Sequence, residues 1–65
     1  MKEIGIGFAI DGDFIKVKED HRIVNYRIVK ISNNCNAFCE NRRRGKARWI
    51  NTALDRDIIV AAYRA

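Results

Sequence analysis

The chain has 65 residues, which is enough for one domain, residues 1–65, and too few for two. Hydrophobic residues make up 48% and charged residues 32% of the composition, which excludes an intrinsically disordered chain. The formal net charge of +5 favours acidic partners, of which nucleic acids and acidic protein surfaces are the common kinds.

The N-terminus and the apolar runs indicate in which cellular compartment the protein is expected. Met1-Lys2-Glu3 lacks the apolar core of a secretory signal, and no apolar run reaches the roughly 18 residues needed to cross a bilayer. We therefore expect a cytoplasmic protein that does not bind membranes. Cys35 and Cys39 are then expected to be reduced thiols, because reducing compartments rarely maintain structural disulfides.

The first predicted element is a β-hairpin near the N-terminus. Isoleucine occurs ten times and leucine once, which favours strands, because β-branched side chains suit a pleated surface. From residue 4 to residue 10, bulky side chains alternate with small ones, a period of two that is typical of a strand. Asp11-Gly12 is a tight-turn dipeptide, and alternation resumes over residues 14–18. We predict that these two strands pair.

A longer strand is predicted at residues 22–31, with apolar side chains on both faces, which is typical of the middle of a sheet. Ser32-Asn33-Asn34 ends it, because these side chains compete for backbone hydrogen bonds. Residues 36–40 and 46–51 are predicted to form a second hairpin with residues 41–45 as its loop. The glycine at the end of this loop supplies a left-handed backbone position.

The C-terminal segment has two interpretations. Thr52 followed by Asp55 is typical of a helix start, and apolar residues recur after them at helical spacing. The alternative is a final strand at residues 58–63, because the run Ile58-Ile59-Val60 has low helix propensity. We predict a helix over residues 53–64 and keep the strand as the alternative.

Together these elements predict a small α+β domain, in which an antiparallel meander sheet of four to five strands is closed by the C-terminal helix. The alternative fold class is an all-β small barrel, SH3-like or OB-like, that ends in the strand at residues 58–63. No motif in the chain decides between the two.

The positive charge is concentrated in the middle of the chain. Residues 21–50 carry a net charge of +7, against −2 for residues 1–20 and 0 for residues 51–65. The densest run is Arg42-Arg43-Arg44-Gly45-Lys46-Ala47-Arg48-Trp49, on and beside the loop of the second predicted hairpin.

This run predicts a nucleic-acid interface. Guanidinium groups bind phosphate oxygens bidentately, and exposed aromatic rings stack on unpaired bases. We therefore predict a non-enzymatic nucleic-acid-binding or regulatory accessory protein that contacts the phosphates of DNA or RNA through its central basic patch. If about five cations touch phosphate, the log of the affinity for duplex DNA falls with log salt at a slope of about −4 to −5. The predicted contact residues are Arg42, Arg43, Arg44, Lys46, Arg48, Arg27, Lys30 and Trp49.

Other interpretations of the same residues stay open. Trp49 and Phe38 can be core residues while the arginines only keep an exposed turn soluble. The chain can also be a protein–protein interaction module, an inhibitor or adaptor, whose basic hairpin or sheet edge docks on an acidic partner. An uncovered sheet edge further allows a homodimer.

Residues suited to catalysis or metal binding are few. His21, Cys35 and Cys39 are the available nitrogen and sulfur ligands, whereas structural zinc takes four. His21 has no nucleophile signature beside it, and Asp11 and Asp13 flank a turn glycine, where acidic residues serve backbone geometry. We therefore predict no catalytic residue, no metal site and no cofactor.

Overall fold

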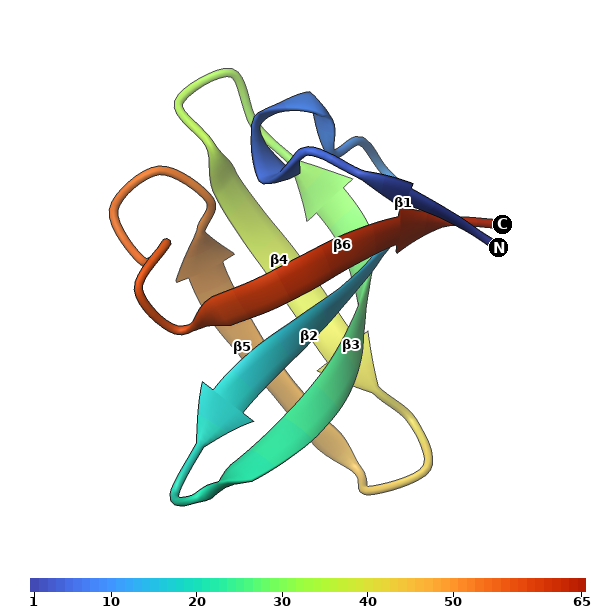
Figure 1. Ribbon diagram of the computed structural model, residues 1–65, viewed down its shortest axis with the longest axis vertical. Helices are drawn as coiled ribbons and strands as arrows, with labels where there is room; N and C mark the ends of the chain where they lie inside the picture. The colour runs from blue at the N-terminus through green and yellow to red at the C-terminus, as the bar shows by residue number, and fades with distance from the viewer.

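The computed structural model describes the whole chain, residues 1–65, and shows an all-β protein (Figure 1). Six strands form one open antiparallel sheet in the order β1-β6-β2-β3-β4-β5. The only helical element is one 3₁₀ turn, η1. The elements are β1 Lys2–Ile4, η1 Ile6–Phe8, β2 Phe14–Glu19, β3 Arg22–Ile31, β4 Asn36–Asn41, β5 Lys46–Asn51 and β6 Ile59–Arg64.

Strands β2 to β5 form a meander whose turns depend on left-handed backbone positions. Asp20 and His21 form the two-residue turn between β2 and β3, with φ values of 44° and 68°. Such a turn has a twist that matches the twist of the strands it joins. Cys35 (φ 70°) and Gly45 (φ 64°) occupy the corresponding positions in the next two turns. At Cys35 this conformation is strained, because a side chain disfavours it.

The core lies on one face of this sheet. The sheet bends so that β4 and β5 cross behind β2 and β6, which encloses that face between two layers (Figure 1). Successive side chains of a strand point to opposite faces, so every second residue contributes to the core. The buried apolar residues are Ala9, Ile15, Val17, Val24, Tyr26, Ile28, Ala37, Cys39, Ile50 and Ala62.

The opposite face of the sheet is exposed to solvent and is called the outer face below. Residues that are directly opposite each other in an antiparallel pair share a face, so the registers of the strands identify its members. From β6 to β5 the outer face includes Tyr63, Phe14, Lys16, Asn25, Arg27, Lys30, Phe38, Glu40, Ala47 and Trp49.

The predicted N-terminal hairpin is wrong. β1 is only three residues long and pairs with β6, not with β2. The next residues form η1 and a loop, so Phe8 (79% exposed) and Ile10 (55% exposed) lie outside the core. Glycines at every second position weaken a strand, which is why the regular alternation was misleading here. Asp11-Gly12 does form a turn, with the Asp13 N–H bonded to the Ile10 carbonyl oxygen at 3.1 Å.

Asp13 fixes this irregular segment. Its carboxylate is buried and accepts hydrogen bonds from the Ile10 N–H (2.8 Å) and from Nε and an Nη of Arg64 (3.0 and 2.9 Å). Arg64 also donates to the carbonyl oxygen of Phe8 (3.2 Å). The Arg64 hydrogen bond lowers the pKa of Asp13 against the effect of burial. The carboxylate therefore connects the loop after η1 to strand β6.

The predicted α+β class and its C-terminal helix over residues 53–64 are also wrong. Residues from Ile59 form β6, which pairs with β1 on one side and β2 on the other. The helix-start signal marks a short series of turns over residues 52–58 and no helix. Asn51 caps the first of these turns, because its side-chain oxygen accepts from the N–H groups of Ala53 (2.9 Å) and Leu54 (2.8 Å). The β-branched run after these turns then favours a strand.

The all-β alternative also differs from the structure in one respect. Its final strand is present as β6, but the sheet is open, because the edge strands β1 and β5 are not hydrogen-bonded to each other. The predicted long strand is present as β3, and the predicted second hairpin is present as β4 and β5.

Replacing Asp13 with Ala should destabilise the fold by about 2 to 3 kcal/mol, because it leaves the Ile10 N–H and the Arg64 guanidinium without their acceptor. The measurement is urea unfolding followed by circular dichroism. Asp57→Ala is the control, since Asp57 is exposed and forms no side-chain hydrogen bond, and it should change the free energy of unfolding by less than about 0.5 kcal/mol. Equal effects of the two variants would contradict this role of Asp13.

Candidate nucleic-acid interface

The structure separates the predicted basic residues into groups with different environments. Lys46 and Arg48 point to the core side of β5, because they alternate with the outer-face residues Ala47 and Trp49. There they meet Glu19 at the end of β2. Lys46 Nζ is 3.1 Å from Glu19 Oε1, and an Arg48 Nη is 2.7 Å from Glu19 Oε2.

Tyr26 completes this cluster of four side chains, which we call the Glu19 cluster. The Tyr26 hydroxyl donates to Glu19 Oε2 at 2.6 Å. The pKa of Glu19 is lowered to about 2, first by the bond from Tyr26 and then by those from Arg48 and Lys46, against the opposing effect of burial. Burial and the bond to Glu19 raise the pKa of Tyr26 to about 12. At neutral pH the Glu19 carboxylate is therefore ionised, and its charge partly neutralises Lys46 and Arg48.

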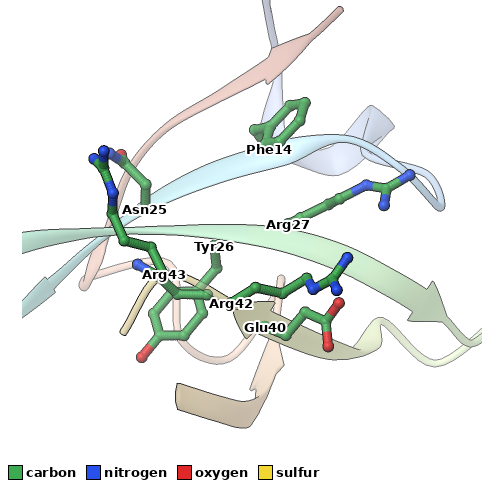
Figure 2. A pocket seen from close by; sticks show the side chains of 8 residues that line it. Phe14, Asn25, Tyr26, Arg27, Glu40, Arg42 and Arg43 are labelled. Carbon is green, nitrogen blue, oxygen red and sulfur yellow. The ribbon is translucent and has the colours of Figure 1, made fainter. Parts of the chain in front are cut away.

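Three other cations gather on the outer face. Arg27 comes from β3, and Arg42 and Arg43 come from the loop between β4 and β5. They line a shallow hollow of about 330 Å³. Figure 2 shows the guanidinium groups of Arg27 and Arg42 extending in the same direction, while Arg43 turns back past Asn25. The other lining residues are Phe14, Asn25, Tyr26, Glu40 and Asn41.

The charge of this hollow is positive. Arg27, Arg42 and Arg43 form no ion pair, and Glu40 is the one acidic residue among the lining residues. Asn41 shapes the loop that carries the two loop arginines, because its side-chain oxygen accepts a hydrogen bond from the Arg44 N–H at 3.0 Å. Arg44 itself is exposed but does not line the hollow.

Lys16 extends the positive surface and was missed by the sequence analysis. It lies on β2 opposite Asn25, and its Nζ is 5.4 Å from the centre of the Tyr63 ring. A second hollow includes Lys16 and shares Phe14 and Asn25 with the first, so the two are adjacent. Alternation along residues 14–18 indicates that Lys16 is exposed, but only the pairing of β2 with β3 shows that it lies near Arg27.

Lys30 and Trp49 lie elsewhere on the outer face. Lys30 is opposite Phe38 of β4, and Phe38 is opposite Trp49 of β5. The prediction that Trp49 is available to a partner agrees with its exposed fraction of 64%, and the interpretation of Trp49 as a core residue is wrong. Phe38 is half-buried.

The residues considered for metal binding or catalysis are not brought together. His21 and Cys35 lie in the turns at opposite ends of the ten-residue strand β3. Cys39 is buried, and burial raises the pKa of its thiol to about 11, so the thiol is protonated at neutral pH. No group of three or more His, Cys, Asp or Glu side chains is arranged to hold a metal ion. The structure also has no helix of the length and apolar character required to span a membrane.

Comparison with known proteins finds no match: no family model, no curated protein and no solved structure is significantly similar to this chain. The function must therefore be argued from the residues themselves.

The lowered pKa of Glu19 predicts how stability depends on pH. Its stabilising effect is complete above the ordinary value of 4.5 and is lost as the pH falls toward the folded-state value of about 2. Glu19→Gln should cost about 2 kcal/mol at neutral pH, after allowance for the solvent screening of the half-exposed Lys46 and Arg48. The difference from the wild type should shrink between about pH 5 and pH 2.

The measurement is urea unfolding by circular dichroism at a series of pH values. Glu3→Gln is the matched control, because Glu3 is exposed and forms no ion pair, and its curve should follow that of the wild type. A difference between Glu19→Gln and the wild type that is independent of pH would contradict the ionised state assigned to Glu19.

Proposed function

We propose that this protein binds nucleic acid without catalysing a reaction, through the outer face of its sheet, as a small accessory or regulatory protein. The observation that carries the proposal is the hollow that Arg27, Arg42 and Arg43 line together while none of them is in an ion pair. Unpaired guanidinium groups that share one face are suited to successive phosphates of a nucleic-acid backbone.

The contact residues proposed here differ from the predicted set. Lys46 and Arg48 are removed as primary phosphate contacts, because Glu19 already holds them and releasing them would leave its carboxylate largely buried without its cations. Lys16 is added, since its hollow shares Phe14 and Asn25 with that of the three arginines. Arg44 and Lys30 line neither hollow, so the phosphate contacts proposed for the hollows are Arg27, Arg42, Arg43 and Lys16.

The arrangement favours backbone contacts over the reading of a base sequence. Phosphate contacts position a protein on nucleic acid but carry no sequence information. The hollow is shallow, and its polar residues other than the arginines are Asn25, Asn41, Glu40 and Tyr26, of which Tyr26 has its hydroxyl bonded to Glu19. We therefore propose that affinity depends mainly on charge and that sequence preference is weak.

The salt dependence of binding tests the proposal. With four phosphate contacts, the log of the affinity should fall with log salt at a slope of about −3 to −4 on duplex DNA and about −3 on single strands. The measurement is fluorescence anisotropy of labelled oligonucleotides titrated at several salt concentrations. A slope near zero would contradict the proposal, and so would polyglutamate binding as tightly as the oligonucleotides, which would favour an acidic protein partner.

A pair of charge-matched triple variants tests the location of the site. Arg27→Ala combined with Arg42→Ala and Arg43→Ala should weaken binding about tenfold or more and reduce the salt slope by about 2 to 3 units. The control replaces Arg22, Arg44 and Arg56, which are exposed but do not line the hollow. It removes the same charge and should weaken binding much less. Equal losses in the two variants would show that net charge, and not this face, determines binding.

A further inference from the structure

An aromatic pair, half-buried Phe38 and exposed Trp49, lies on the outer face and does not belong to the core. Phe38 and Trp49 are directly opposite each other on β4 and β5, with ring centres 5.2 Å apart and ring planes tilted by 57°. Trp49 is 64% exposed, although large aromatic side chains are usually well buried. It lies on the edge strand β5, which has no further strand beside it to cover the indole ring.

Cations lie on the β3 side of this aromatic pair. Lys30 lies opposite Phe38 on the side of β3. Two residues along β4 from Phe38, Glu40 lies opposite Arg27, one of the arginines of the hollow. Same-face residues two apart on a strand are about 7 Å from each other. The rings and the basic hollow therefore lie close enough on the outer face for a strand of a few nucleotides to contact both.

We propose that the nucleic acid bound by this face is single-stranded, and that an unpaired base stacks on Trp49 beside Phe38 while Lys30 and the hollow hold the adjoining phosphates. This inference rests on the proposed function. In a duplex both faces of each base are already covered by neighbouring bases, so an exposed indole ring gains a stacking partner only from an unpaired base. An exposed aromatic ring beside cations fits a single strand, which presents bases and phosphates in alternation. An acidic protein surface is the alternative that the titration with polyglutamate tests.

The experiment uses Trp49 as its own reporter, because it is the only tryptophan in the chain. The full chain is titrated with a 15-nucleotide oligo(dT), with oligo(U) of the same length, with a duplex of the same length and with polyglutamate. Stacking of a base on the indole quenches its emission. We expect quenching by the two single strands, little quenching by the duplex or by polyglutamate, and tighter binding of the single strands than of the duplex.

A substitution separates stacking from charge. Trp49→Ala should weaken single-strand binding by about 5- to 100-fold and leave duplex binding within about twofold, because stacking contributes per unpaired base and the phosphate contacts remain. Trp49→Phe should recover part of the loss. Leu54→Ala is the control. Leu54 is also a large apolar residue, is 83% exposed and lies in the turn after β5, away from the aromatic pair in the sequence. Circular dichroism verifies that each variant is folded. The quenching experiment is carried out on the wild-type protein, so it does not depend on the folding of any variant.

The outcomes distinguish this inference from the proposed function. Salt-dependent binding with unchanged Trp49 emission and no loss in Trp49→Ala would overturn the single-strand inference and leave the proposed function in place. Equal quenching by polyglutamate would also overturn it. The absence of salt-dependent binding to any oligonucleotide would overturn both.

Discussion

The Glu19 cluster is the interaction on which the arrangement of the rest depends. Glu19 ends β2, whereas Lys46 and Arg48 belong to β5, and these two strands are not neighbours in the sheet. The cluster therefore fastens the two layers of the bent sheet together. The Tyr26 hydroxyl and two cations share one carboxylate that is largely withdrawn from water, so removal of the acid would leave three donors without their acceptor. The cluster also decides which basic residues are free, because it engages two from the densest run and leaves Arg42 and Arg43 for the outer face.

Sequence patterns were reliable where local geometry controls the structure. The second hairpin, the long strand β3 and the exposure of the arginine loop follow from alternation and from a glycine at a left-handed position. The patterns failed where a residue distant in the sequence determines the local structure. The Asp13 carboxylate, held by Arg64 at the other end of the chain, fixes an irregular N-terminal segment that alternation predicted as a strand. Likewise Asn51 caps the first of a series of turns that resembled a helix start. The β-branched residues that follow then pair with β2 as strand β6.

Only part of the site could be predicted, because its assembly also depends on contacts between distant parts of the chain. Composition identified the basic region, and Trp49 proved to be exposed, but a count of charges cannot show that alternate residues of β5 point to opposite faces of the sheet. That alternation separates Lys46 and Arg48 from the outer face. Lys16 joins the positive surface through the register of β2 on β3, which depends on the turn at Asp20 and His21. The protein is thus a small bent sheet whose two layers are joined by the Glu19 cluster and whose outer face carries guanidinium groups free of ion pairs beside an aromatic pair.

The most direct test of this account is the response of the arginine and tryptophan side-chain N–H signals in NMR spectra to a short oligonucleotide. Binding through the outer face predicts shifts for Arg27, Arg42, Arg43 and the Trp49 indole, with Arg48 and Arg64 unchanged because their carboxylate partners hold them. Shifts confined to Arg22, Arg44 and Arg56, or a release of Arg48 from Glu19 on binding, would contradict it.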